Sequence, residues 1–86
     1  MSKLAAEGES LELRREAGGL RHYLDDEPLH AGELLELGLD DGSWALGRYE
    51  WTYREADPPL FFVDTETDSV IMLRPGARLR WPGRTG

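Results

Sequence analysis

Two histidines and seventeen carboxylates are the side chains of this 86-residue sequence with the clearest capacity for chemistry. His22 and His30 have Asp25 and Glu27 between them, and zinc accepts both imidazole and carboxylate ligands. The sequence contains no His-x-x-His or similar paired spacing, and histidines in strands and loops commonly serve as structural hydrogen-bonding residues. We therefore predict no metal and no cofactor, and we expect His30, close to Gly32, to order its loop by bonding to the backbone.

Catalytic arrangements of other kinds are also missing from the sequence. General acid–base catalysis needs a desolvated cleft that separates the pKa values of two carboxyl groups, and a small β domain has little room for one. Adjacent acids such as Asp25/Asp26 and Asp40/Asp41 are more typical of turns. No Gly-x-Ser-x-Gly motif surrounds a serine, and the glycines are dispersed instead of forming a phosphate-binding loop. We predict that the protein is not an enzyme.

Residues 42–51, GSWALGRYEW, combine two tryptophans, a tyrosine and an Arg/Glu pair. Aromatic residues and arginine are the usual anchors of protein interfaces, and small barrels bind peptides through aromatic grooves. We predict a surface patch that binds a protein partner near the end of this segment. Its candidate residues are Arg48, Trp51, Tyr53, Arg54, Arg80 and Trp81. The alternative is structural: one tryptophan closes each end of a barrel, and Arg48 stacks over an indole ring.

The net charge is −7 at pH 7, with a pI near 4.7, and it is unevenly distributed. Residues 1–73 hold 17 acidic and 6 basic side chains, whereas residues 74–86 hold Arg74, Arg78 and two further arginines without any acid. Net acidity opposes general binding to nucleic-acid phosphates. The charge nevertheless suggests two alternatives to protein binding. One is an acidic regulator or inhibitor that imitates nucleic acid, and the other is a weak nucleic-acid binder that uses the arginine-rich C-terminal strand and stacking on Trp81.

The acidic alternative requires one continuous negative surface. The residues that would form it are Asp25, Asp26, Glu27, Glu33, Asp40 and Asp41.

The elements that must position these residues are short alternating segments bounded by turn residues, which predict strands. The predicted strands are 10–16, 20–26, 33–39, 44–53, 60–64, 70–73 and 78–81. A short helix over 10–17 is the competing interpretation at the N-terminal end, because Leu, Glu and Arg also favour helices. Residues 27–32, 54–59 and 74–77 are predicted connections, since they contain proline or glycine.

Gly47 lies inside the aromatic strand and suggests a β-bulge or a sharp bend. A bulge would change the side-chain alternation, so that Trp44, Leu46 and Tyr49 turn inward together. Arg48 would then lie at the surface, with Trp51 or Tyr53 beside it.

Regular short strands in a chain of this length predict an all-β domain, and we expect a small SH3-like barrel or roll of five to seven short antiparallel strands. It should span residues 10–82, with flexible ends at 1–9 and 83–86. The predicted core consists of Leu13, Leu35, Leu37, Leu46, Tyr49, Phe61, Val63, Ile71, Leu73 and Leu79.

Several phrases occur in a recognisable order between residues 20 and 81: Leu-His-x-Gly at 29–32, Leu-Glu-Leu at 35–37, Gly-x-Trp at 42–44 and Gly-Arg-x-Glu at 47–50. This order resembles a family of short, uncharacterised bacterial domains of unknown function. In that family a cysteine often occupies the position of Ala31, so the resemblance implies no thiol or metal role here. It implies a fold and not an activity.

The beginning of the sequence, MSKLAAEGES, lacks the apolar run of a secretory signal, and no window approaches the length of a membrane span. The absence of cysteine fits a reducing compartment. We expect a cytoplasmic protein without membrane contact. An exposed edge strand would also allow a homodimer.

Overall fold

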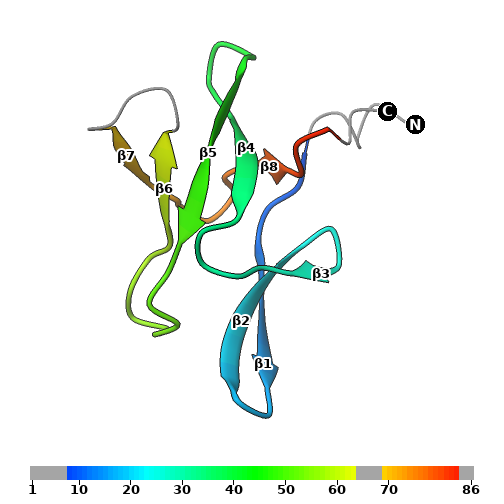
Figure 1. Cartoon of the computed structure of the whole chain (residues 1–86), viewed down its shortest axis with the longest axis vertical. Helices are drawn as coiled ribbons and strands as arrows, with labels where there is room; N and C mark the ends of the chain where they lie inside the picture. Colours follow the sequence, from blue (N-terminus) through cyan, green and yellow to red (C-terminus); the bar gives the residue numbers. More distant parts are fainter. Residues whose placement is uncertain (1–7, 64–68, 84–86) are drawn as a thin grey trace.

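The computed structural model describes residues 8–63 and 69–83. The described residues form eight strands and no helix, which confirms the all-β prediction (Figure 1). The strands are β1 (Glu12–Glu16), β2 (Gly19–Leu24), β3 (Glu27–Pro28), β4 (Leu34–Gly38), β5 (Trp44–Glu50), β6 (Leu60–Val63), β7 (Val70–Met72) and β8 (Leu79–Arg80). The predicted flexible ends fall largely outside the described residues, as does Arg84 of the arginine-rich segment.

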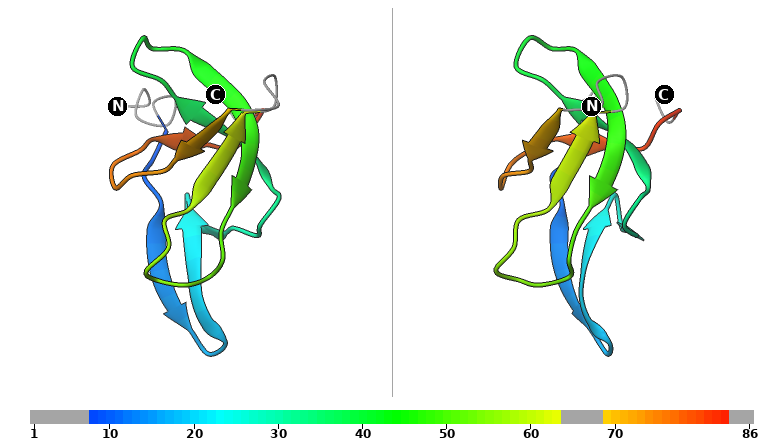
Figure 2. Two further views of the ribbon diagram at one scale, coloured as in Figure 1. Left: turned by 90° about the vertical axis from the view of Figure 1, so that its left-hand side faces the viewer. Right: turned by 60° about the vertical axis from the view of Figure 1, so that its left-hand side comes forward.

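The strands pair into two antiparallel sheets, one in the order β1-β2-β3 and one in the order β7-β6-β5-β4-β8. Just before β1, the backbones of Glu9 and Leu79 exchange two hydrogen bonds of 2.8 Å and connect the sheets through an isolated bridge. Figures 1 and 2 show the hairpin of β1 and β2 projecting away from the five-stranded sheet. The described strands do not close into a barrel, so the expected SH3-like barrel is not confirmed. The two edges of the five-stranded sheet are β7 and the two-residue β8, and these edges do not pair with one another among the described residues.

The three-stranded sheet contains the predicted N-terminal hairpin, in which Glu16 pairs with Gly19 across a two-residue turn. The second strand ends at Leu24, two residues earlier than predicted, because Asp25 and Asp26 form the next turn with φ values of 54° and 67°. Positive φ at both central residues is the requirement of a two-residue type I′ hairpin turn, which aspartate tolerates. The chain then pairs again as β3 within the segment predicted as a connection.

β5 lies at the centre of the five-stranded sheet and is flanked by β4 and β6. It ends at Glu50, although the aromatic alternation continues to residue 53. Tyr53 adopts a φ of 65°, which is left-handed and incompatible with extended backbone. The prediction of a strand over 44–53 was therefore too long at its C-terminal end.

The predicted bulge at Gly47 is wrong. Pairing continues without interruption from Leu34↔Arg48 to Gly38↔Trp44, and Gly47 also pairs with Val63 on the other side. The glycine is needed for close packing instead. A Cβ atom at this position would lie 2.4 Å from the carbonyl oxygen of Phe62 and 2.6 Å from the ring of Phe61.

The core lies on the inward face of the five-stranded sheet, where the hairpin and the connecting loops cover it. Its buried apolar members are Leu24, Leu29, Leu35, Leu37, Tyr49, Trp51, Phe61, Leu73 and Leu79. Six of these residues were predicted, while Val63 and Ile71 are half-buried and pack against the cluster. Leu24, Leu29 and Trp51 were not predicted.

Two predicted core residues are placed differently. Leu46 lies on the outward face with Trp44 and Arg48, because the register of β5 is regular. Leu13 is 41% exposed, although it pairs with buried His22 and shares its face of the hairpin. The prediction of Leu13 as a core residue is therefore wrong, because the projecting hairpin leaves it beside an open cavity and outside the core.

Candidate functional site

The outward face of the five-stranded sheet carries a row of apolar side chains. The register aligns Leu34 of β4, Arg48 of β5, Phe62 of β6 and Val70 of β7 directly across four strands. Leu34 is 45% exposed, Phe62 37% and Val70 47%. In an antiparallel sheet with one solvated face, the side chains on that face are normally polar. An apolar row is therefore unusual there.

A second row on the same face extends the surface. Glu50, Leu60 and Met72 pair across β5, β6 and β7, and Met72 is 54% exposed. A shallow cavity of about 490 Å³ lies between these rows and the loop after β5. It is lined by Arg48, Glu50, Trp51, Thr52, Pro58, Leu60 and Phe62. We call the exposed residues Leu34, Arg48, Phe62, Val70 and Met72 the outer face.

Arg48 is the cation of the outer face, and it lies between Leu34 and Phe62 in the row. It is exposed, and within residues 8–63 and 69–83 it makes no ion pair. A guanidinium offers five N–H donors in a planar fork that matches a carboxylate. The outer face therefore presents apolar area beside a guanidinium that has no ion pair with the described residues.

The structure divides the six predicted contact residues between two places. Arg48, Trp51, Tyr53 and Arg54 belong to β5 and the loop that follows it, whereas Arg80 and Trp81 lie at β8 on the far edge of the sheet. Trp51 is only 7% exposed, which contradicts its expected surface position. Its indole N–H donates to the carbonyl of Asp57 at 2.7 Å.

Tyr53 and Arg54 are exposed, and the Tyr53 ring centroid lies 5.4 Å from that of Trp51. The aromatic and arginine residues around β5 therefore form a local group. They do not join with β8 into the single patch expected from their composition.

Arg80 and Trp81 serve structural contacts at β8. The guanidinium of Arg80 lies 4.0 Å from the centroid of the Trp44 ring and donates to Glu36 at 2.7 Å. Trp81 donates its indole N–H to the carbonyl of Leu24 at 3.1 Å. A cation does cover a tryptophan, as the structural alternative required, but it is Arg80 and not Arg48.

The outward face of the three-stranded sheet differs in character, because its charged side chains pair with one another. Arg14 contacts Glu12 at 2.9 Å and Asp26 at 2.5 Å, and its guanidinium lies 4.1 Å from the centroid of the Tyr23 ring. The hydrogen bond from Arg14 holds the pKa of Glu12 below its ordinary value.

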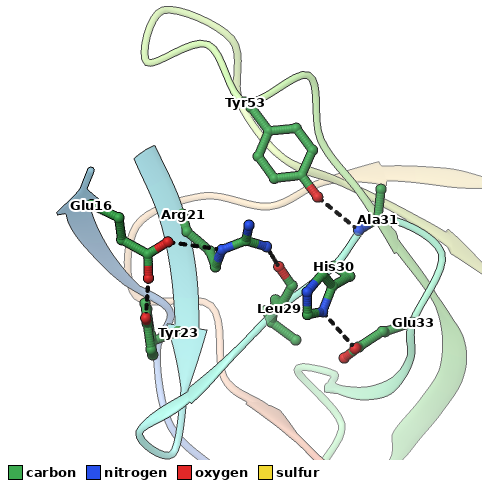
Figure 3. A network of polar contacts seen from close by, with 8 residues as sticks. All are labelled: Glu16, Arg21, Tyr23, Leu29, His30, Ala31, Glu33 and Tyr53. Atoms are coloured by element: carbon green, nitrogen blue, oxygen red, sulfur yellow. Dashed lines mark hydrogen bonds and ion pairs between the residues drawn. The ribbon is translucent and has the colours of Figure 1, made fainter. Parts of the chain in front are cut away.

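Arg21 and Tyr23 continue this polar network across the hairpin (Figure 3). Arg21 donates to Glu16 at 3.1 Å and to the carbonyl of Leu29 at 3.0 Å, and the Tyr23 hydroxyl donates to the other oxygen of Glu16. Both hydrogen bonds lower the pKa of Glu16, and the one from Tyr23 has the larger effect. Arg21 thereby fixes the chain after β3 against β2.

The loop before β4 is fixed by a second set of contacts (Figure 3). The backbone N–H of Ala31 donates to the hydroxyl of Tyr53 at 3.1 Å, and His30 Nδ1 lies 3.2 Å from a carboxylate oxygen of Glu33. His30 therefore orders its loop through the Glu33 side chain and not through the backbone as we expected. The other oxygen of Glu33 is buried and has no hydrogen-bond partner among the residues that the structure describes.

A second cavity lies between the hairpin and the loops that follow β5 and β7, with a volume of about 370 Å³. His22 and Trp51 contribute to its wall, and their ring centroids are 4.2 Å apart. His22 is 8% exposed, and its Nδ1 lies 2.8 Å from the hydroxyl of Tyr49. Burial lowers the pKa of His22, which favours the neutral imidazole.

The acidic residues named for the imitation of nucleic acid are distributed over separate turns. Asp25 and Asp26 form the turn after β2, whereas Glu33 and Asp40 lie just outside opposite ends of β4. Asp41 accepts hydrogen bonds from the N–H and hydroxyl of Ser43 at 2.9 and 2.6 Å, which lower its pKa.

Within the described segments, no group of three or more His, Asp or Glu side chains is placed to hold a metal ion. No helix among these residues is long and apolar enough to span a membrane.

The outer face could have been found in the sequence from two short segments. Residues 60–63 (LFFV) and 70–73 (VIML) are apolar without alternation, which in an antiparallel sheet means that both faces are apolar. We predicted strands here and placed only their alternate residues in the core, and the outward residues Phe62, Val70 and Met72 were not named as contact residues.

These observations define a small all-β protein with two antiparallel sheets and an exposed apolar face on the larger one. Comparison with known protein families, curated proteins and solved structures finds no match for the chain. The resemblance of residues 20–81 to short bacterial domains therefore stays a prediction.

Proposed function

We propose that this protein is a non-catalytic binding module that docks a protein partner on the outer face of the five-stranded sheet. The observation that carries the proposal is the aligned row Leu34–Arg48–Phe62–Val70, which is exposed in all its members. Contiguous apolar surface of this kind marks interaction sites in soluble proteins. The proposal rests on this face and does not require an SH3-like barrel.

The chemistry of the face specifies the partner. Apolar side chains around Arg48 match an apolar surface that carries one carboxylate, and that carboxylate would pair with the guanidinium after both groups lose water. Aromatic residues and arginine at the centre of a desolvated patch are typical of residues that dominate binding energy. Of the residues predicted from sequence, Arg48 is therefore the one that we expect to contact the partner most closely.

The proposal is tested by comparing two double variants with the same change in net charge. Val70→Lys with Met72→Lys adds two positive charges to the outer face, whereas Glu12→Gln with Asp26→Asn removes two negative charges from the opposite sheet. Each protein is immobilised, and proteins retained from a native lysate are identified and then purified for direct titration. We expect a purified partner to bind the wild type and the Glu12/Asp26 variant, and to lose binding to the Val70/Met72 variant.

Equal binding of the partner to both double variants would contradict docking on the outer face. Sedimentation of the wild type provides a separate check. A dimer dissociated by Val70→Lys and Met72→Lys would identify a second copy of this chain as the occupant, in place of a different protein.

A further inference from the structure

His22 is a buried polar residue with one unused hydrogen-bonding atom. Its Nδ1 bonds to the hydroxyl of Tyr49, and within residues 8–63 and 69–83 its Nε2 has no hydrogen-bond partner. Only 8% of the residue is exposed, and that residue lines the cavity between the hairpin and the loops after β5 and β7. Nε2 is not sealed from solvent, because Glu33 Oε2 is the only fully buried unpaired side-chain atom among the described residues. A molecule in the cavity can therefore compete with water for this nitrogen.

The environment of Tyr49 decides which imidazole nitrogen carries the hydrogen. Tyr49 is fully buried, and burial raises the pKa of its hydroxyl, which therefore keeps its proton. The described partner of that hydroxyl is His22 Nδ1. A phenol that accepted from Nδ1–H would leave its own O–H without an acceptor among the described residues, so we assign the phenol as donor and Nδ1 as acceptor. In neutral imidazole the remaining nitrogen, Nε2, then carries the N–H. The cavity wall thus offers a hydrogen-bond donor.

Most of the cavity wall is apolar. Its apolar residues include Leu11, Leu13, Trp51, Pro58, Pro59 and Leu73. The volume of about 370 Å³ falls within the range of small-molecule sites. Leu13 is 41% exposed beside this cavity, and an occupant there would cover it.

The charge of the lining selects against anions. Arg74 contributes one positive charge, whereas Glu55 and Asp57 contribute two negative charges, and His22 is neutral. The lining therefore has a net charge of −1. An uncharged ligand avoids both repulsion by these carboxylates and the desolvation cost of a buried charge.

From this geometry we infer that the cavity binds a small, uncharged, largely apolar molecule whose carbonyl oxygen accepts a hydrogen bond from His22 Nε2. Trp51 and Leu13 would contact its apolar body. The residues changed in the docking test, Val70 and Met72, do not line this cavity, although Trp51 and Pro58 line both this cavity and the one at the outer face.

The inference is tested with acetophenone, which combines a phenyl ring with a carbonyl oxygen, and with ethylbenzene, in which a methylene replaces the carbonyl. Each probe is titrated into the full-length protein, and two-dimensional ¹H–¹⁵N NMR follows the imidazole nitrogens of His22 and the indole N–H of Trp51. We expect saturable shifts of both residues with acetophenone and about tenfold weaker binding of ethylbenzene, the equivalent of one neutral hydrogen bond. Benzoate, the charged analogue, should bind more weakly than acetophenone.

Two histidine variants locate the effect. Asparagine places an acceptor at the position of Nδ1 but has no counterpart of Nε2, so His22→Asn keeps a partner for Tyr49 and removes the donor. We expect His22→Asn to weaken acetophenone binding about tenfold and to leave ethylbenzene binding unchanged. The control His30→Asn alters a histidine outside the cavity and should change neither affinity.

Equal affinities for acetophenone and ethylbenzene would overturn the role of His22 as a donor. Titrations in which neither probe shifts Trp51 or His22 would overturn the site itself. The Val70→Lys, Met72→Lys variant should bind acetophenone like the wild type, so loss of partner docking and loss of this site are separately observable.

Discussion

The outward faces of the two sheets differ in how their side chains find partners. On the three-stranded sheet, Arg14 and Arg21 each contact carboxylates on the same sheet or in its turn, so the charged groups satisfy one another. On the five-stranded sheet, Leu34 and Phe62 flank Arg48, Val70 extends the row beyond Phe62, and Arg48 has no ion pair among the described residues. Both faces are built from antiparallel strands with the same alternation. Exposed side chains that pair with one another, as on the three-stranded sheet, do not by themselves suggest a binding surface. Exposed apolar side chains without partners in the described chain are the better indication of one.

The largest expected effect separates the inward and outward faces of a single strand. Phe61 is fully buried, whereas the neighbouring Phe62 is 37% exposed on the outer face. Phe61→Ala should lower the free energy of unfolding by about 3–5 kcal/mol, because it leaves a core cavity. Phe62→Ala should cost only about 1 kcal/mol, the scale of a cross-strand pair. Urea denaturation of both variants measures the difference, and similar losses would mean that Phe62 is structurally covered.

The second effect concerns binding and compares two arginines. Arg48→Ala should weaken the binding of a purified partner by about 1.5–3 kcal/mol, which is the range for a hydrogen bond to a charged group. Arg14→Ala, on the opposite sheet, should leave the affinity unchanged because Arg14 is engaged by Glu12 and Asp26. Isothermal titration calorimetry checks both variants. If Arg48→Ala left the affinity for the partner unchanged, the proposed pairing between Arg48 and a carboxylate of the partner would be wrong.

A third effect is a dependence of stability on pH that originates in the inward face of the hairpin. Burial places the folded-state pKa of His22 below its ordinary value of 6.5. Below pH 6.5 the unfolded chain binds a proton that the folded chain resists, so stability should fall as the pH decreases from 6.5 toward the folded-state pKa. The carboxylates of Glu12 and Glu16, whose pKa values are lowered from 4.5, act in a more acidic range.

Denaturant titrations at pH 7 and pH 5 test this dependence, with His22→Asn as the comparison. The difference in stability between the two pH values should become smaller in the variant. An unchanged difference would show that His22 titrates alike in the folded and unfolded chains.

The smallest expected effect distinguishes two arginines on the same sheet. Arg80→Lys keeps the charge but loses the planar stacking on Trp44, and we expect it to cost about 0.5–1 kcal/mol. Arg48→Lys should not change stability, because Arg48 makes no ion pair within the described residues. Thermal unfolding followed by circular dichroism measures both variants. If Arg80→Lys were as stable as the wild type, the stacking of Arg80 on Trp44 would contribute nothing to stability.

The sequence was informative about local structure because strands have a period of two. Alternation predicted the N-terminal hairpin and the inward positions of Leu35, Leu37 and Phe61. Gly47 was recognised as a special position, but its cause was misassigned. A bulge and a close approach of the Phe61 ring both favour glycine, and only the packing distinguishes them.

The candidate site was predicted less well than the strands. Arg48 was identified from its residue type and from the aromatic residues around it, and it does lie on the outer face. Trp51 was expected at the surface, but the loop after β5 turns back and buries it, with Asp57 accepting its indole N–H. Phe62, Val70 and Met72 were missed because the predicted patch was sought among arginine and aromatic residues near β5 and β8, and the outward positions of the apolar strands were not considered.

Composition and spacing by themselves determined that this chain forms short strands joined by tight turns, since backbone sterics and side-chain alternation act over a few residues. Tertiary structure alone decided that the strands divide into two sheets, that one apolar face remains uncovered and that His22 lines a cavity. Those outcomes depend on which distant segments pack together. A strand specifies its two faces locally, but whether each face meets protein or solvent is set by contacts made far along the chain.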